Sequence, residues 1–303
     1  MATGPSSGTF TGSIVALVTP MSDDGAVDFA ALAELVEWHI AEGTDGIVAV
    51  GTTGESATLS VDEHMEVVRR VQTQVRGRIP VIAGTGANAT NEAIELTLAA
   101  QALKVDACLM VTPYYNKPPQ EGLYRHYKAI AQASSGPILL YNVPGRTGCD
   151  MLPETVMRLS TIANIVGIKE ARGDLERRTA LLELGLPKSF ALISGDDATA
   201  ADAILGGFVA DISVTANVAP GAMHRMCAAA LSGNTALTRE LDAPLRGLHD
   251  QLFVEPNPIP VKWALAAMGR IPKGLRLPLV PLASQYESAV QGALTAAGIA
   301  TTQ

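Results

Sequence analysis

The stretch ILLYNVPGRTGCDMLPETVMRLSTIANIVGIK, residues 138–169, contains one complete unit of the fold. It starts with the aliphatic run Ile138–Asn142, continues through a polar cluster and a segment of helical character, and ends with a second run, Ile165–Lys169. Short aliphatic runs that end in polar clusters are typical of buried strands. A helix between two such strands allows them to lie parallel. The stretch therefore predicts a strand–helix–strand unit.

The same unit recurs along most of the chain. Asp28 is placed to cap a helix of apolar residues spaced three and four apart, and Ser60 with Glu63 forms a capping box that begins a helix extending to Val75. Eight units without a glycine-rich dinucleotide motif after the first strand favour an α/β fold of the closed (β/α)8 TIM barrel type over a doubly wound sheet. The eight predicted strands, with centres about 20 to 34 residues apart, are Ile14–Val18, Gly46–Val50, Val81–Gly84, Ala107–Val111, Ile138–Asn142, Ile165–Lys169, Phe190–Ser194 and Asp211–Val214.

The alternation of strand and helix stops near Ala222. The remaining residues are rich in Ala and Leu, have helical periodicity, and are interrupted by Pro256, Pro258 and Pro260. We predict that residues 1–221 form the barrel that carries the active site and that residues 222–303 form a C-terminal helical extension packed on it. A solenoid is the alternative architecture, although the units share no sequence pattern beyond the alternation itself.

Composition and charge exclude several classes of protein. Hydrophobic residues make up 48% and charged residues 17%, which excludes a disordered chain. No apolar run approaches the ~18 residues of a membrane span, so we expect no membrane partner. The net charge is −8, and residues 1–68 contain no Lys or Arg. The beginning of the chain therefore resembles neither a secretory signal nor a transit peptide.

Two further observations concern partners and compartment. Basic residues form no stripe that could follow phosphates, so nucleic acid is not expected to bind. The three cysteines, Cys108, Cys149 and Cys227, are an odd number without CxxC spacing. This usage is typical of a reducing compartment. We predict a cytoplasmic location.

In an α/β barrel the active site lies at the carboxyl ends of the strands. The clusters that follow the predicted strands concentrate reactive groups at Gly51–Glu55, Thr112–Asn116, Tyr141–Thr147 and Lys169-Glu170. We therefore expect the functional residues to come from these four clusters.

Among the seven lysines, only Lys169 lies on a predicted strand. Strand alternation places Ile165, Gly167 and Lys169 on one face and Val166 and Ile168 on the other. If the first set faces inward, the amine of Lys169 enters the mouth of the barrel.

An amine among apolar walls loses its proton more readily and can attack a carbonyl group. Lys169 is therefore a candidate for Schiff-base chemistry. The alternative is a structural salt bridge to Glu170 or another acid.

Three other positions could support this chemistry. The phenol of Tyr141 could accept and return protons, or Tyr141 could be a core residue with a satisfied hydroxyl group. Thr52 and Thr53 lie between glycines, where hydroxyl and backbone N–H groups can converge on a carboxylate, although such a sequence is often only a turn. Arg146 follows a tight turn and could bind a second carboxylate or remain a solvated loop residue.

A metal centre is not expected. The five histidines lie on helical stretches without HxH or HExxH spacing. An aldol-type enzyme without a metal must hold its enolate equivalent as an enamine on lysine. The sequence also has no GxSxG elbow and no P-loop.

With these residues in place, the chain resembles the dihydrodipicolinate synthase family of pyruvate-dependent class I aldolases. The resemblance extends from about Gly12 to Gly298 and is dense at every strand end. The turn with Arg146 distinguishes this branch from the sialic acid lyases. The matching motifs are GTTGESAT (51–58), GTGAN (84–88), TPYYNKP (112–118), YNVPGRT (141–147), GIKEA (167–171), SGDD (194–197) and ISVTAN (212–217).

The resemblance implies a role for each catalytic candidate. Lys169 would form the Schiff base, Tyr141 would donate and accept protons, and Thr52 would be its hydrogen-bond partner. Tyr115 would complete the proton relay from an adjacent subunit of a homotetramer built as a dimer of dimers.

The resemblance also implies the substrates. Thr53 and the backbone of Ile212 would hold pyruvate, while Arg146 would hold the carboxylate of L-aspartate 4-semialdehyde. Condensation and ring closure would give 4-hydroxy-tetrahydrodipicolinate, a precursor in lysine and diaminopimelate biosynthesis. No external cofactor would be needed, because the covalent imine forms on Lys169.

A regulatory site for L-lysine is implied as well. Val61 stands where lysine-inhibited members typically carry histidine, which predicts weaker feedback inhibition. Arg172 replaces a small hydroxyl residue near the rim of the active site. The residues that match the regulatory site are Ser56, Ala57, His64, Asn88, Glu92 and Tyr114.

Two other functions stay open. Another Schiff-base pyruvate aldolase or dehydratase acting on a sugar acid would be favoured if Arg146 did not face the pocket. A catalytically silent barrel that binds an oxo-acid would be expected to have lost Lys169, Tyr141 or Thr52.

Overall fold

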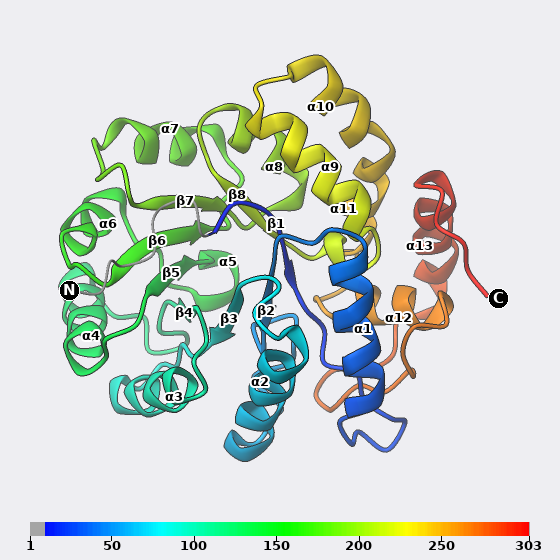
Figure 1. Ribbon diagram of the computed structural model, residues 1–303, viewed down its shortest axis with the longest axis horizontal. Helices are drawn as coiled ribbons and strands as arrows, with labels where there is room; N and C mark the ends of the chain where they lie inside the picture. The colour runs from blue at the N-terminus through cyan, green and yellow to red at the C-terminus, as the bar shows by residue number, and fades with distance from the viewer. Residues whose placement is uncertain (1–9, 303) are drawn as a thin grey trace.

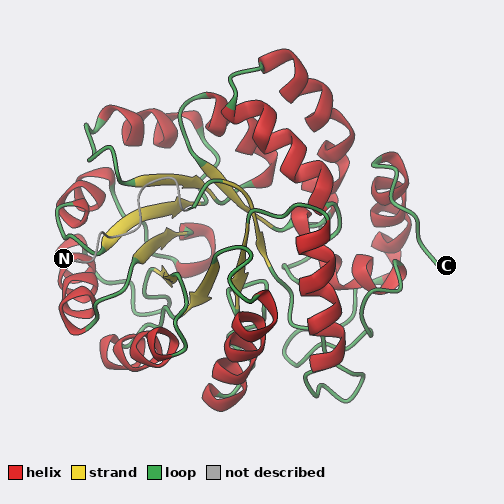
Figure 2. Ribbon diagram, in the orientation of Figure 1, coloured by secondary structure: helices red, strands yellow, loops and turns green. Residues whose placement is uncertain are grey.

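The computed structural model describes residues 10–302, and they form a closed barrel of eight parallel strands in chain order (Figure 1). Strand β8 pairs with β1 and closes the barrel. Figure 2 shows the strands at the centre and the helices around them. The predicted (β/α)8 TIM barrel is therefore confirmed. The strands are β1 (Gly12–Ala16), β2 (Gly46–Ala49), β3 (Val81–Gly84), β4 (Ala107–Val111), β5 (Ile138–Asn142), β6 (Ile165–Glu170), β7 (Ala191–Ser194) and β8 (Ala210–Ser213).

Helices cover the outside of the barrel, and several follow one another after the last strand. Helix α13 packs against α11 and α12 at one side of the molecule (Figure 1). The helices are α1 (Phe29–Ala41), α2 (Val61–Val75), α3 (Thr90–Ala102), α4 (Gln120–Ala133), α5 (Pro144–Thr147), α6 (Pro153–Ser160), α7 (Leu175–Glu183), α8 (Asp197–Leu205), α9 (Pro220–Leu231), α10 (Thr235–Asp242), α11 (Arg246–Gln251), α12 (Ile259–Ala267) and α13 (Ser284–Ala296), with short 3₁₀ turns at Thr215–Asn217 and Ala243–Leu245.

The predicted helix starts are confirmed. The carboxylate of Asp28 accepts hydrogen bonds from the first backbone N–H groups of α1, and Ser60 with Glu63 forms the capping box of α2. The first strand begins at Gly12 instead of Ile14. The reason is that Gly12 pairs with Ala210 of β8, a contact that a glycine's low strand propensity does not predict.

Strand alternation divides the apolar side chains into two cores. One fills the barrel and includes Ile14, Val48, Leu139 and Ile212. The other lies between the strands and the helices. Lys169 and Tyr141 thus sit at the end of a packed interior, not in an open pore.

The expected alternation is wrong at the start of β6. Ile165 packs in the outer core and Val166 against the inner one. The cause is an irregular register, because Ile138 pairs with Ile165 while Leu139 pairs with Gly167, so that one residue of β6 is skipped. From Gly167 onward the alternation is as expected.

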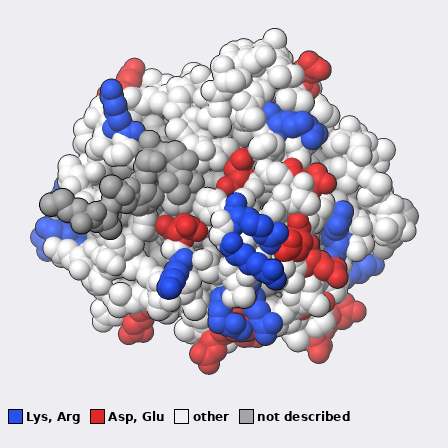
Figure 3. All heavy atoms as spheres, viewed as in Figure 1, with Lys and Arg blue, Asp and Glu red and all other residues white. Residues whose placement is uncertain are grey.

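Surface charges of both signs lie interspersed on the face in Figure 3. Some charged surface residues form ion pairs, such as Arg78 with Glu37 at 2.6 Å. Within residues 10–302, no helix is both long and apolar enough to cross a membrane.

Candidate active site

A cavity of about 450 Å³ opens at the carboxyl ends of the strands. It brings together residues from loops and strand ends that are far apart in the sequence, as the barrel topology requires. Of the predicted catalytic and substrate-binding residues, the cavity is lined by Thr52, Thr53, Tyr141, Arg146, Lys169 and Ile212.

Lys169 and Tyr141 are direct cross-strand neighbours on β6 and β5. Both are buried, and Nζ of Lys169 lies 4.5 Å from the centroid of the Tyr141 ring. A side chain on Gly195 would place a Cβ atom 2.6 Å from Cε of Lys169, so a larger residue there would displace the lysine side chain. The amine and the phenol ring therefore share one confined space.

The salt-bridge alternative for Lys169 is not supported. Lys169 takes part in none of the ion pairs found among residues 10–302, and Glu170 points to the outer face, where it pairs with Arg177 at 3.3 Å. The amine is thus held by packing and remains directed into the cavity.

The loop with Thr52 and Thr53 is a series of turns that follows β2. A Cβ atom on Gly54 would lie 2.9 Å from Cα of Val50, so the loop can pass this point only with glycine. The side chain of Glu55 is fully buried and pairs with Lys262 of α12. This ion pair ties the loop to the last part of the chain.

Asn257 is a functional candidate that the sequence reasoning missed. Its Nδ2 donates to Oγ1 of Thr53 at 2.9 Å, and its backbone carbonyl accepts from Nη2 of Arg146 at 3.3 Å. It therefore contacts one predicted residue of each substrate subsite, Thr53 and Arg146. The signal was the sequence Pro256-Asn257-Pro258, which breaks the helical pattern and is typical of a fixed turn.

Three further lining residues also come from the last part of the chain. His249, Asp250 and Phe253 face the cavity from α11 and the turn after it. His249 is buried, and its Nδ1 lies 2.9 Å from Oγ1 of Thr215. In the sequence, this segment is indistinguishable from an ordinary amphipathic helix.

Tyr115 does not line this cavity. Its side chain is 89% exposed, and its φ of 73° is left-handed, an uncommon conformation for a bulky residue. The side chain is thus held away from its own barrel.

A second cavity, of about 310 Å³, lies beside the first. Asn88 is not part of its wall, but its Nδ2 donates to the carbonyl of Tyr114 at 3.2 Å. The two cavities share Thr52, Val143 and Arg146. Of the predicted regulatory residues, the second cavity is lined by Ser56, Ala57, His64, Glu92 and Tyr114.

The protonation of His64, the exposure of Val61 and the pKa of Tyr114 characterise the wall of this second cavity. Burial lowers the pKa of His64, so the ring is neutral at neutral pH, and its Nε2 donates to the carbonyl of Gly84 at 2.7 Å. The side chain of Val61 lies exposed at the rim. Burial and the nearby Glu92 raise the pKa of Tyr114.

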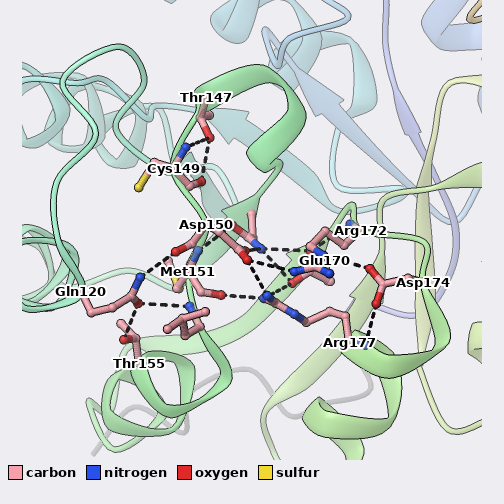
Figure 4. A network of polar contacts seen from close by, with 12 residues as sticks. Gln120, Thr147, Cys149, Asp150, Met151, Thr155, Glu170, Arg172, Asp174 and Arg177 are labelled. Carbon is pink, nitrogen blue, oxygen red and sulfur yellow. Dashed lines mark hydrogen bonds and ion pairs between the residues drawn. The ribbon is translucent and has the colours of Figure 1, made fainter.

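Arg172 lies away from both cavity walls. Its guanidinium bridges Asp150 at 3.0 Å and Asp174 at 2.9 Å, as Figure 4 shows. The side chain of Arg172, which is larger than the small hydroxyl residue expected here, is therefore held by two acidic partners outside the active site. In the described part of the chain, no three His, Cys, Asp or Glu side chains are grouped as metal ligands.

The barrel and the cavity at the carboxyl ends of its strands, which Lys169 lines, define the class of protein, an α/β-barrel enzyme. The model of the dihydrodipicolinate synthetase family matches residues 9–297, and the chain belongs to this family. A 4-hydroxy-tetrahydrodipicolinate synthase from Methylococcus capsulatus is 61% identical over 288 residues, which cover 95% of this chain and 99% of the relative.

Two solved structures extend the comparison. A chloride-inhibited dihydrodipicolinate synthase from Acinetobacter baumannii, complexed with pyruvate, is 56% identical, with a TM-score of 0.95 over 96% of this chain and 100% of that one. The enzyme from Cyanidioschyzon merolae, with lysine bound, is 40% identical, with a TM-score of 0.93 over 96% of this chain and 99% of that one.

Proposed function

We propose that this chain condenses pyruvate with L-aspartate 4-semialdehyde to give 4-hydroxy-tetrahydrodipicolinate, and so acts as a lyase of lysine and diaminopimelate biosynthesis. The observation that carries the proposal is the buried amine of Lys169, which lies 4.5 Å from the ring centroid of Tyr141 inside the cavity. Membership of the dihydrodipicolinate synthetase family supports the same reaction.

The first half of the reaction forms the covalent intermediate. The amine of Lys169 attacks the keto carbon of pyruvate, and a carbinolamine forms. Tyr141 returns a proton to the departing hydroxyl group, water leaves, and the imine remains. Loss of a proton from the methyl carbon then gives the enamine. The cycle is proposed to need no external cofactor, since the imine itself stabilises the carbanion.

The second half joins the two substrates. The enamine carbon attacks the aldehyde carbon, and the aldehyde oxygen takes up a proton. The amino group of the second substrate then attacks the imine carbon, which closes the ring and releases Lys169 as a free amine. Each proton transfer is assigned to the phenol of Tyr141, with Thr52 as its partner.

The substrate-binding roles follow from the positions of the remaining side chains. Thr53 and the backbone at Ile212 are proposed to hold the pyruvate carboxylate, because both line the cavity beside Lys169. Arg146 is proposed to bind the carboxylate of the aldehyde, since its guanidinium borders the same cavity. Asn257 would orient both subsites through its contacts with Thr53 and Arg146.

A second copy of the chain is proposed to complete the site. Tyr115 is exposed in a single chain and does not line the cavity of its own barrel, which supports the proposal that it enters the relay of a neighbour in the predicted homotetramer. The second cavity is proposed to bind L-lysine, with Glu92 facing the ammonium group. Its shared wall with the active site would couple the two ligands.

The decisive experiment mixes the purified chain with both substrates and follows product through a coupled reductase. In parallel, borohydride is added with pyruvate alone, and the adduct is located by mass spectrometry. The proposal predicts turnover and a pyruvyl group on the peptide with Lys169. Labelling of a different lysine, or activity lost with EDTA and restored by a divalent ion, would contradict it.

A further inference from the structure

The residues that directly follow Tyr141 and Lys169 form a second cross-strand pair. Tyr141 is opposite Lys169, and Asn142 is opposite Glu170. Because neighbouring strand residues point to opposite faces, the first pair lies inside the barrel and the second lies behind it, under the helices. Asn142 and Glu170 are 0% and 2% exposed.

The outer pair is closely hydrogen-bonded. Nδ2 of Asn142 donates to both carboxylate oxygens of Glu170, at 3.1 Å and 3.0 Å, and to Oδ1 of Asp150 at 2.8 Å. Oδ1 of Asn142 accepts from the backbone N–H of Met151 at 2.9 Å. The amide of Asn142 thus has a partner on both of its ends.

Arg177 of α7 completes the network in Figure 4. Its side chain is buried, and it donates to Glu170 at 3.3 Å, to Asp150 at 2.7 Å and to the carbonyl of Met151 at 2.7 Å. Arg172 touches Glu170 only through its backbone N–H, at 2.9 Å, while its guanidinium binds Asp150 and Asp174.

The location of this network matters because the β5–β6 register is irregular. The shift at Ile138 and Leu139 lies only two residues before the Tyr141–Lys169 pair. A slip of one residue would turn Lys169 to the outer face. Because β5 and β6 pack against an apolar core on each face, a slip would exchange one apolar side chain for another, whereas it would also separate the buried polar pair from its partners.

We propose that Asn142 and Glu170 are positioning residues that fix the β5–β6 register at the barrel mouth and so hold the amine of Lys169 against Tyr141. This inference rests on the proposed role of Lys169. Neither residue touches substrate, since both face away from the cavity. Their effect is on the alignment of the reacting groups, and a displacement of about 1 Å at such groups lowers rates by about 10²-fold.

The test compares Glu170→Gln and Asn142→Ser with a matched control, Arg172→Ser. The control removes two ion pairs from the same network but keeps the backbone N–H bond to Glu170. We expect both test variants to lower kcat and the rate of borohydride-trapped imine formation together by about 30-fold or more, with the pyruvate KM changed less than about 3-fold. The control should stay within about 2-fold of wild type.

A double variant separates positioning from simple stability. Asn142→Leu/Glu170→Met replaces the buried polar pair by apolar groups, which often restores stability, and Arg177 keeps its bonds to Asp150 and to the carbonyl of Met151. We expect its melting temperature to exceed that of the single variants while its imine formation stays slow. It also carries the test if neither single variant folds.

Two results would overturn the inference without affecting the proposed function. One is that the folded variants keep kcat within about 3-fold of wild type. The other is that activity returns with stability in the double variant. Failure of the wild-type chain to form an adduct on Lys169 would instead contradict the proposed function itself.

Discussion

Replacing Lys262 by methionine is expected to destabilise the chain strongly, although Lys262 is not a proposed catalytic residue. Its side chain is 1% exposed and its only ion-pair partner in the described structure is Glu55, which is 0% exposed. Lys262→Met keeps the volume but leaves a buried carboxylate with one weak partner, the backbone N–H of Arg276 at 3.4 Å. Breaking a buried pair in this way costs about 3–5 kcal/mol.

The assay is urea denaturation followed by circular dichroism, together with pyruvate KM. The loss of about 3–5 kcal/mol should also lower the melting temperature, measured by thermal unfolding with the same signal, by roughly 5–8 °C, because the unfolding entropy of 303 residues is about 0.64 kcal/mol/K. The KM for pyruvate should rise because the ion pair of Glu55 with Lys262 holds the loop that carries Thr53. Lys188→Met, at an exposed loop position, is the control and should change stability by less than about 0.5 kcal/mol.

A double variant tests whether the loss of stability comes from the unpaired charge of Glu55. Glu55→Gln/Lys262→Met removes both charges, so it should recover a large part of the stability lost in Lys262→Met. If Lys262→Met costs less than about 1 kcal/mol, or the double variant is no more stable than the single one, the reasoning that the pair holds the loop is refuted.

Four other outcomes are expected. Tyr141→Phe should lower kcat by about 10²-fold or more with a smaller change in pyruvate KM, since acid–base assistance contributes about 10²–10⁴; steady-state kinetics with each substrate varied will measure this. Arg146→Ala should raise the KM for the aldehyde and spare that for pyruvate, and the reverse pattern would contradict its assignment. Calorimetry should detect binding of L-lysine, and Val61→His should strengthen this binding. Pyruvate should change the affinity for lysine by the same factor by which lysine changes the affinity for pyruvate, whereas no heat and no inhibition at millimolar lysine would contradict the regulatory site. Burial raises the pKa of Glu170 from 4.5 to about 7, so the folded state binds more protons than the unfolded state between these pH values. The free energy of unfolding should therefore fall by up to about 3 kcal/mol as the pH rises from 4.5 to 7, and denaturation curves taken from pH 4.5 to 8 should show a smaller decrease for Glu170→Gln.

The strands and helix starts could be predicted because their signals are local. The runs around Ile138 and the capping box at Ser60 depend on residues fewer than ten positions apart. The face to which each side chain of β6 points could not be predicted for the whole strand. Val166 is skipped in the pairing of β6 with β5, and this irregularity leaves no signal in the sequence of β6 alone. Alternation holds from Gly167 onward, so Lys169 takes the inward direction that the sequence analysis gives as a condition for its role.

The catalytic candidates were visible for a different reason. Barrel topology brings all strand ends to one rim, so Lys169 and Tyr141 could be placed together without any contact being known. Arg172 could not be placed in this way. Its partners Asp150 and Asp174 are acids that look like ordinary surface residues in the sequence.

Contacts across more than 200 positions decide what the last part of the chain does. Asn257 bonds Thr53 across 204 positions, and Lys262 pairs with Glu55 across 207. Both partners lie in one loop after β2, and this loop contributes side chains to both cavities. A residue pair at this separation leaves no periodic signal, so composition suggested only helices that pack on a barrel. The contacts show instead that α12 and the turn before it hold the Thr52–Thr53 loop in place. A change in either element should therefore alter pyruvate binding, although no hydrogen bond or ion pair among residues 10–302 joins either element to Lys169.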